Sequence, residues 1–281
     1  MNIKELEKEY IQSLSDLYGA DEAKALFILS TSNILKLTQS EILLKQDRAV
    51  AVKESNKLLK ILEDLKKGKP IQHILGETLF YRLPFNVNEN VLVPRPETEE
   101  LVDWIINEVK DSKKTLLDIG TGSGCIAITL KKNLQHLDVS AIDISDKALS
   151  VAKDNATLNK VEINFIETDI LTYSTNESYD IIVSNPPYIR ELEKAEMHKN
   201  VLEHEPHQAL FVSDENPLVF YEAIANFAVK NLNPNGYLFF EINEYLWAET
   251  LQILIDKQFK NIELKKDMQG KDRMIMARTN P

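Results

Sequence analysis

The sequence of 281 residues contains a single cysteine, Cys125. One thiol excludes an intramolecular disulfide framework and a cysteine-rich zinc site. No segment approaches the roughly 18 consecutive apolar residues that a membrane helix needs, and the first residues mix both charge signs without the apolar core of a signal peptide. The 43% of hydrophobic residues is enough for one α/β core and a smaller unit. We therefore expect a soluble cytoplasmic protein.

Basic clusters are also scarce. The formal net charge is −11, and the acidic excess falls within residues 71–281, whereas residues 1–70 are nearly neutral. Only the short run Lys66-Lys67-Gly68-Lys69 is locally basic. Proteins that bind nucleic acid usually neutralise its phosphates with a clustered basic surface. The charge distribution therefore argues against direct binding of DNA or RNA.

Residues 1–69 predict a small helical bundle, because apolar residues recur there every three or four positions. Gly19 is expected to end the first helix, Asp21 to cap the second, and Thr38 or Ser40 to cap the third, before a fourth helix. No residue type in this bundle suggests chemistry. We expect a domain that serves structure or the docking of a substrate.

Residues 70–93 are interpreted as a hairpin linker, since Gly and Pro precede a stretch of alternating apolar residues in which Pro84 favours an edge strand. Residues 94–281 form the next domain. Strands and helices alternate in it, which predicts an α/β fold with a mostly parallel sheet and helices on both faces. Seven strands are expected, at 115–119, 139–142, 163–166, 181–184, 237–242, 262–264 and 274–277.

The first of these strands runs into a glycine-rich turn, Gly120-Thr121-Gly122-Ser123-Gly124. Glycines adopt positive φ and let a ligand approach the backbone closely. The dinucleotide fingerprint has the spacing Gly-x-Gly-x-x-Gly, but here the spacing is Gly-x-Gly-x-Gly, and Cys125 stands where the third fingerprint glycine would fall. The turn therefore predicts a ligand site, and its spacing argues against a bound pyrophosphate.

Acidic residues stand at the ends of three successive strands, at Asp118, Asp143 and Asp169. Ligands of such sheets bind beyond the carboxyl ends of the strands. Asp143 could accept hydrogen bonds from both ribose hydroxyls, and Asp169 could bind the adenine amino group. Each aspartate alone would more often be a helix cap. Together with the glycine turn they favour a cationic sulfonium nucleoside, so we predict a site for S-adenosylmethionine and no metal.

The segment Asn185-Pro186-Pro187-Tyr188 follows an apolar strand at the same edge of the sheet. Two prolines fix φ at consecutive positions and so stiffen the turn. A planar amide or aromatic amine could donate its N–H groups to the Asn185 side-chain oxygen and the Pro186 carbonyl, while Tyr188 stacks on the planar group. Such a clamp would aim the nitrogen at a methyl donor by positioning alone. We predict a substrate site at Asn185–Tyr188, with Asn185 also touching the cofactor.

In this position the motif resembles class I methyltransferases that modify planar nitrogens of DNA adenine, rRNA guanine or protein glutamine. Four segments together closely resemble the HemK/PrmC-type glutamine methyltransferases of peptide chain release factors: Pro94–Glu99, Leu117–Gly124, Ser184–Ile189 and Gly270–Arg273. The similarity covers nearly the whole chain, including the helical N-terminal domain and Glu205-Pro206.

The resemblance implies a Rossmann-like class I methyltransferase sheet of seven strands with a small all-α N-terminal domain. It implies the glutamine of the Gly-Gly-Gln tip of class I release factors as substrate and N5 as the methylated atom. It also implies cofactor contacts at Gly120–Gly124, Asp143 and Asn185. The chain departs from the family in two places. Ile170 stands where an aromatic residue often covers adenine, and Asn243 stands where glycine often ends a later strand, a turn that asparagine can make in the left-handed conformation.

Other residues receive plainer interpretations. His198, His204 and His207 lie near two glutamates, but their spacing matches no metal-ligand pattern, and we interpret their segment as a mobile lid on the substrate side. Cys125, Trp104 and Trp247 are expected to pack in the core. Two rival functions stay open: an N-methyltransferase acting on an exocyclic amino group of adenine or guanine, and a binding protein that keeps the fold without catalysis.

Overall fold

The protein was analysed as a computed structural model, in which residues 1–109, 114–196 and 199–280 are described. The chain divides into two compact units. The first comprises Met1–Gly76 with His198–His204, and the second comprises Glu77–Met197 with Glu205–Pro281. His198, one of the three histidines noted in the sequence, lies outside the described residues.

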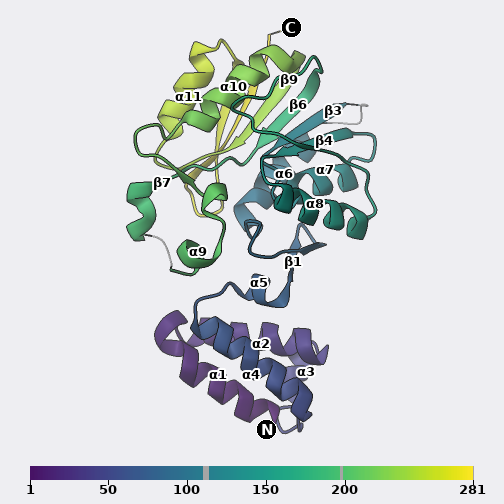
Figure 1. Ribbon diagram of the computed structural model, residues 1–281, viewed down its shortest axis with the longest axis vertical. Helices are drawn as coiled ribbons and strands as arrows, with labels where there is room; N and C mark the ends of the chain where they lie inside the picture. The colour runs from purple at the N-terminus through teal and green to yellow at the C-terminus, as the bar shows by residue number, and fades with distance from the viewer. Residues whose placement is uncertain (110–113, 197–198, 281) are drawn as a thin grey trace. The chain divides into compact units, whose positions relative to one another are not determined.

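The first unit is built from helices (Figure 1). Its helices are α1 (Ile3–Tyr18), α2 (Ala20–Leu35), α3 (Gln39–Leu44), α4 (Val52–Lys66), α5 (Ile71–Leu75) and α9 (Lys199–His204). Tyr10 and Phe27 pack edge to face in its core, with ring centroids 5.3 Å apart. The Tyr10 hydroxyl donates to the carbonyl of Leu58 at 2.6 Å, which satisfies a polar group at full burial.

Helix starts in this unit follow the sequence in part. Thr38 caps α3 in a reciprocal capping box with Glu41, as one of the two expected alternatives. The expectation that Asp21 caps α2 is wrong: Gly19, at φ +84°, occupies the N-cap and Asp21 lies in the first turn. A glycine takes this position because its backbone conformation is unfavourable for other residues. Helix α5 differs from the expectation, because the sequence predicts a hairpin linker over 70–93 and the structure has a helix at Ile71–Leu75.

The second unit begins with the hairpin of β1 (Glu77–Phe80) and β2 (Leu83–Asn86). Two asparagines of α8 (Asp146–Asn159) bind the backbone of β2. Asn155 exchanges two hydrogen bonds with Asn86, at 2.6 and 2.9 Å, and the Asn159 amide donates to the Pro84 carbonyl at 2.9 Å. These bonds satisfy backbone groups of β2 that would otherwise be free at the edge of the hairpin.

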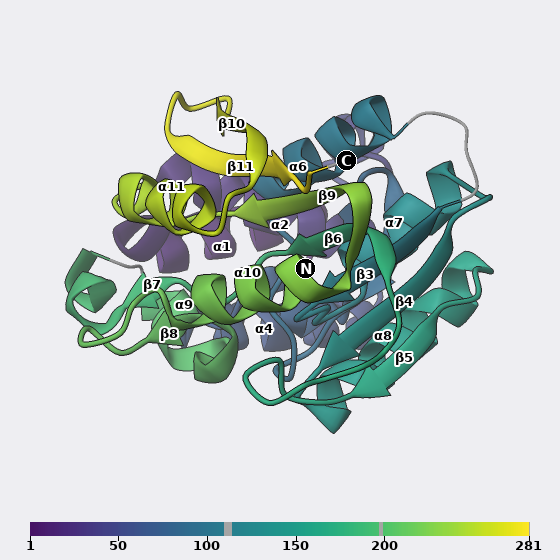
Figure 2. The same cartoon turned by 90° about the horizontal axis from the view of Figure 1, so that it is seen from above.

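Seven strands form the central sheet in the order β10-β11-β9-β6-β3-β4-β5, as Figure 2 shows. β11 alone runs against its neighbours, and the other strands are parallel to one another. The strand bounds are β3 (Thr115–Ile119), β4 (Asp138–Asp143), β5 (Asn164–Glu167), β6 (Tyr179–Ser184), β9 (Leu232–Glu241), β10 (Lys260–Lys266) and β11 (Asp272–Arg278). The seven strands expected from the sequence all form, although β9 begins five residues before the expected start.

Successive residues of the strands face opposite layers of helices, because side chains alternate along a strand. Leu116 of β3 packs in one hydrophobic cluster with α6 (Pro96–Glu108) and α7 (Cys125–Asn133), whereas Leu117 packs in the other with α10 (Val219–Asn231) and α11 (Trp247–Asp256). Figure 1 shows these helices on the two sides of the sheet. Trp104 and Cys125 are core residues as expected, but Trp247 is not, since it is 39% exposed.

Short elements complete this unit beyond β6. β7 (Ile189–Arg190) pairs with β8 (Phe211–Val212), and two 3-10 turns, Glu191–Glu196 and His207–Ala209, lie between the two strands in the sequence. In the sequence, β3, β4 and β5 follow one another toward one edge of the sheet. The chain then returns to the other side of β3 to form β6, so the strand order reverses at β3. Sheets of this kind bind their ligands at such a switch point, beyond the carboxyl ends of the strands. Across the described ranges, no helix combines the length and the apolar character needed to cross a membrane.

Candidate active site

A cavity of about 370 Å³ lies beyond the carboxyl ends of β3, β4 and β6, at the switch point of the sheet. Eight of the residues singled out in the sequence line it: Gly120, Gly122, Asp143, Asp169, Ile170, Asn185, Pro186 and Pro187. The described lining is mostly apolar, and it contains two carboxylates but no lysine, arginine or histidine. The cavity therefore suits a largely apolar ligand with a positive charge better than a phosphate.

The glycine turn owes its shape to backbone conformations that other residues avoid. Gly120, Gly122 and Gly124 have φ of +73°, +54° and +80°. A Cβ on Gly124 would lie 2.8 Å from Ile128, whereas Cβ atoms on the other two would meet no protein atom within 4 Å. The absence of a side chain at Gly124 thus leaves room for the neighbouring side chains of α7 and α8. At Gly120 and Gly122, the absence of a side chain keeps the cavity side of the turn open.

Thr121 and Ser123 do not line the cavity; both are buried beneath the turn. The Thr121 hydroxyl donates to Oδ2 of Asp118 at 2.6 Å, and the N–H of Ala127 donates to the same oxygen at 3.3 Å. Oδ1 of Asp118 is buried and has no hydrogen-bond partner within the described part of the chain. Burial raises the pKa of Asp118 to about 7. This carboxyl supports the turn from below at a cost in desolvation.

Asp143 joins the end of β4 to the glycine turn. Its Oδ2 accepts the N–H of Gly122 at 2.8 Å, and its Oδ1 accepts the N–H of Ser145 at 2.9 Å. Burial raises the pKa of this carboxyl, and the backbone donors act against that rise. Asp143 is not a helix cap, because Ser145 caps α8. Its carboxylate is therefore aligned by the backbone at the wall of the cavity.

Asp169 and Ile170 lie in the loop after β5, which begins beside Asp143, because the N–H of Thr168 donates to the Asp143 carbonyl at 3.0 Å. Oδ1 of Asp169 accepts the N–H of Leu171 at 2.9 Å and so forms a local turn. The loop then crosses α10, where Tyr173 stacks on Phe227 with ring centroids 5.5 Å apart. This packing fixes the position of Ile170, the apolar residue that stands in place of an aromatic one.

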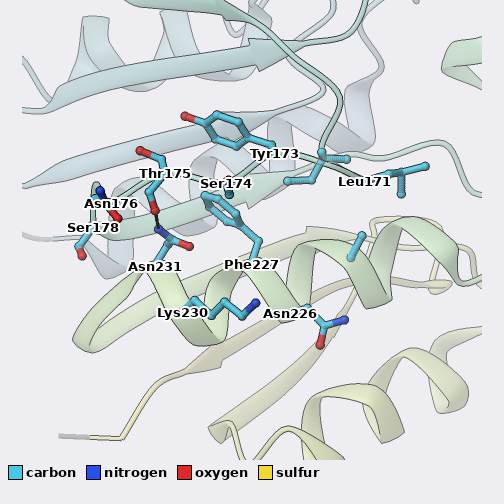
Figure 3. Close-up of a pocket in the computed structure, with 12 residues that line it drawn as sticks. Leu171, Tyr173, Ser174, Thr175, Asn176, Ser178, Asn226, Phe227, Lys230 and Asn231 are labelled. Carbon is cyan, nitrogen blue, oxygen red and sulfur yellow. Dashed lines mark hydrogen bonds between the residues drawn. The ribbon is translucent and has the colours of Figure 1, made fainter.

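A second hollow, with a volume of about 490 Å³, lies between the same loop and α10, and Figure 3 shows the residues that line it. Ile170 and Leu171 line both hollows. The Asn231 amide of α10 donates to the carbonyls of Thr175 and Glu177, at 3.1 and 2.7 Å. The Asn231 amide nitrogen therefore binds the loop of its own chain. We interpret the residues around this hollow as a support for the cavity wall rather than as a ligand site.

The reactive segment begins where β6 ends. The Ser184 hydroxyl donates to the carbonyl of Ile119 at 2.7 Å, which ties β6 to β3 next to the glycine turn. The Asn185 amide nitrogen donates to Oγ1 of Thr98 in α6 at 3.3 Å. Tyr188 does not line the cavity; its hydroxyl donates to Oε1 of Glu241 at 3.2 Å, and burial raises the pKa of this phenol. Asn185 is brought to the cavity, and Tyr188 lies behind it.

Asn243 supports the reactive segment from a second side. It is buried, and its amide nitrogen donates to the Tyr188 carbonyl at 2.9 Å and to the Glu193 carboxylate at 3.1 Å. Its side-chain oxygen accepts the N–H of Tyr245 at 2.8 Å. The expectation of a left-handed turn is wrong, since Asn243 does not have positive φ. Asparagine here acts through its side chain rather than through backbone freedom.

Several contributors to the cavity carry no sequence signal that reasoning could use. The cavity is also lined by residues 90–92 after the hairpin, by Gln208 and Ala209 of the second 3-10 turn, and by Phe220 and Ile224 of α10.

Glu205 explains why the segment Pro94-Arg95-Pro96 and the pair Glu205-Pro206 occur together. Its buried carboxylate accepts the N–H of Val93 at 3.1 Å and pairs with Arg95 at 2.5 Å. Pro94-Arg95-Pro96 and Glu205-Pro206 are therefore two sides of one contact. In the described part of the chain, no three histidine, cysteine or acidic side chains are grouped as a metal site would need.

A seven-stranded sheet with one reversed strand, a glycine turn at its switch point and an Asn-Pro-Pro-Tyr segment beside it define a Rossmann-like methyltransferase. A family model described as a methyltransferase small domain matches residues 98–211, and one described as the PrmC N-terminal domain matches residues 5–76. Two solved structures share the fold. A methyltransferase from Pyrococcus furiosus is 15% identical, with 82% of this chain and all of that chain covered and a TM-score of 0.54. A human methyltransferase 10 domain containing protein is 18% identical, with 70% and 89% covered and a TM-score of 0.51.

Closer relatives narrow this class. The release factor glutamine methyltransferase of Flavobacterium psychrophilum is 51% identical over 282 residues, with 98% of each chain covered. That of Bacteroides thetaiotaomicron is 43% identical, with 95% of this chain and 96% of its own length covered. The chain belongs to the release factor glutamine methyltransferase family, which confirms the resemblance seen in the sequence.

Proposed function

We propose that this enzyme transfers a methyl group from S-adenosylmethionine to N5 of the glutamine in the Gly-Gly-Gln motif of class I peptide chain release factors. The observation that carries the proposal is the placement of Asn185 and Pro186 on the same cavity as Gly120 and Asp143. A clamp for a planar nitrogen and a nucleoside site share one space of about 370 Å³. The names of the relatives supply the substrate class, and a translation factor as substrate agrees with a cytoplasmic enzyme.

The cavity fits the proposed cofactor. When bound, S-adenosylmethionine supplies an electrophilic methyl group on a sulfonium cation. Asp143 offers an aligned carboxylate for the ribose diol, and Asp169 and Ile170 offer a polar and an apolar group for adenine. Gly120 and Gly122 leave room for close approach, because no side chain covers the backbone there. The two carboxylates at the cavity also favour a cation by charge.

The chain's own residues would act by binding and orientation. The glutamine amide donates one N–H to the Asn185 oxygen and one to the Pro186 carbonyl, which directs the face of the nitrogen toward the methyl donor. The prolines keep both acceptors rigid. No general base is needed before attack, because the nitrogen becomes acidic once methylated and then releases its proton. Positioning therefore accounts for most of the expected rate enhancement.

The direct test is methyl transfer from labelled S-adenosylmethionine to a purified class I release factor, beside a factor with Gln→Ala in its Gly-Gly-Gln tip. Label on the intact factor alone would support substrate, residue and reaction together. Label on rRNA or DNA in place of the factor would favour the nucleic-acid alternative. An Asn185→Ala variant that keeps full turnover would contradict the clamp.

We also propose that residues 1–69, which contain helices α1 to α4 of the first unit, hold the protein substrate, with 70–93 as linker to the methyltransferase domain. The support is a separate hydrophobic core and the absence of candidate catalytic residues from its described part. A chain without residues 1–69 should bind the release factor more weakly, with unchanged affinity for the cofactor. Unchanged affinity for the factor would contradict this role.

A further inference from the structure

Thr98 connects Asn185 to a buried carboxylate. Thr98 lies in the first turn of α6 and is 3% exposed, and Glu241 is the last residue of β9 and is 2% exposed. The Thr98 hydroxyl donates to Oε2 of Glu241 at 2.7 Å, and its oxygen accepts from the Asn185 amide at 3.3 Å. Three elements distant in the sequence thus meet in one chain of hydrogen bonds.

The direction of this chain follows from counting protons. An ionised carboxylate only accepts hydrogen bonds, and a hydroxyl has one proton to donate. Since Thr98 gives its proton to Glu241, it can only accept from Asn185. The Asn185 atom that faces Thr98 must therefore be the nitrogen, and the side-chain oxygen is left for the cavity. Oxygen is the atom that a substrate amide N–H requires.

The hydrogen bonds that Glu241 accepts are those of an ionised carboxylate, although burial raises its pKa. The hydrogen bonds from Thr98 and Tyr188 and the charge of Arg273 act against that rise. Each carboxylate oxygen has its own donor, because Tyr188 binds Oε1 at 3.2 Å and Thr98 binds Oε2. The Arg273 side chain is itself held by Asp267 at 3.1 Å. Glu241 thus holds both ends of Asn185–Tyr188, one directly and one through Thr98.

We propose that Thr98 and Glu241 are positioning residues for methyl transfer: the Glu241 carboxylate orients the Thr98 hydroxyl, which holds the Asn185 amide with its oxygen toward the substrate nitrogen. This inference rests on the proposed function of the same site. Neither residue lines the cavity, so neither touches substrate or cofactor. Their contribution should fall on turnover rather than on cofactor binding.

The test uses Thr98→Val, which keeps the shape and removes the hydroxyl, and Thr98→Ser, which keeps the hydroxyl. Thr98→Val should lower kcat on the release factor by about 10- to 100-fold, the scale expected when a reacting group is misplaced. Its dissociation constant for S-adenosylmethionine, measured by calorimetry, should stay within about threefold, because the bond it removes lies outside the cavity. Thr98→Ser should recover most of the turnover.

Three results would overturn the proposal: turnover of folded Thr98→Val close to that of the wild type, failure of Thr98→Ser to recover activity, or an equal loss of cofactor affinity. If Thr98→Val melts near the assay temperature, Thr98→Ala is judged by the same criteria. A spectroscopic readout separates this inference from the proposed function. In ¹H–¹⁵N spectra, the side-chain amide pair of Asn185, identified by its loss in Asn185→Asp, should move in Thr98→Val and return in Thr98→Ser. An unmoved pair would refute the orientation even if the substrate is another molecule.

Discussion

The carboxylate of Asp143 accepts a hydrogen bond from the backbone N–H of Gly122 at 2.8 Å, across 21 residues of sequence. This bond links the ends of two neighbouring strands and places a negative charge at the turn. The contact serves both the shape of the cavity and its charge. Replacement of Asp143 should therefore affect ligand binding more than folding.

Asp143→Ala is expected to weaken the binding of S-adenosylmethionine by about 10- to 100-fold, since a hydrogen bond to a charged group is worth roughly 1.5–3 kcal/mol. Titration calorimetry of the purified variant measures this change. The control is Asp146→Ala, which removes an exposed carboxylate from the first turn of the neighbouring helix α8. Equal affinities of the two variants would contradict a role of Asp143 in the cofactor site.

Gly124→Ala should destabilise the protein more than Gly122→Ala does. Both substitutions place a side chain at positive φ, which costs about 1–2 kcal/mol. Only at Gly124 does the new Cβ meet other protein atoms, the end of the Ile128 side chain at 2.8 Å and Cβ of Ala152 at 3.2 Å. Because the end of the Ile128 side chain can shift, this crowding should add about 1 kcal/mol, the low end for overpacking. Urea unfolding of both variants measures the difference in the free energy of unfolding. Similar losses at the two positions would show that the contacts with Ile128 and Ala152 do not select glycine.

Stability should depend on pH through Asp118, whose pKa rises to about 7 on burial. The folded state then holds this proton more tightly than the unfolded state does. The contribution of Asp118 to the free energy of unfolding is therefore largest at pH 4 and below. It falls by up to about 1.4 kcal/mol per pH unit as the pH rises toward 7. Above pH 7 the contribution stays constant.

Thermal unfolding of the wild type and Asp118→Asn between pH 4 and pH 8 checks this dependence. The variant should show a flatter profile, because its amide does not titrate. Asp138→Asn, a substitution at an exposed position of β4, is the matched control and should retain the wild-type slope. Identical profiles for wild type and Asp118→Asn would contradict the buried proton.

The ion pair between Arg95 and Glu205 should matter more than a surface pair. The Glu205 side chain is 1% exposed and that of Arg95 is 34% exposed. Arg95→Ala would leave a buried carboxylate with one backbone donor, and we expect a loss of about 2–3 kcal/mol, below the roughly 3–5 kcal/mol of a fully buried pair. Lys266→Ala, which breaks a pair with Asp272 that is more exposed, should cost about 0–1 kcal/mol.

Denaturation in urea compares these variants. Adding Glu205→Gln to Arg95→Ala should restore part of the lost stability, because the remaining buried group is then neutral. No recovery in the double variant would indicate that Arg95 stabilises through packing rather than through charge.

The helices and strands of this protein were largely readable from local sequence. The glycine turn follows from the strand 115–119 and the spacing of Gly120, Gly122 and Gly124, and these features are set by neighbouring residues. Asn185 could be placed at the ligand edge because parallel strands end at one edge of the sheet. Helix α5 and the N-cap at Gly19 were missed, since short helices and caps depend on contacts that periodicity does not reveal.

The sequence by itself determined the fold class, the family and the residue types at the site, because these depend on periodicity, strand ends and short motifs. Only the tertiary structure decided how those residues are held. It joined Thr98 to Asn185 and Glu241, joined Asn243 to Tyr188, and joined Arg95 to Glu205. Hydrogen bonds between residues from 55 to 143 positions apart carry no local pattern, since each partner is ordinary in its own segment and meets the other only when the sheet closes.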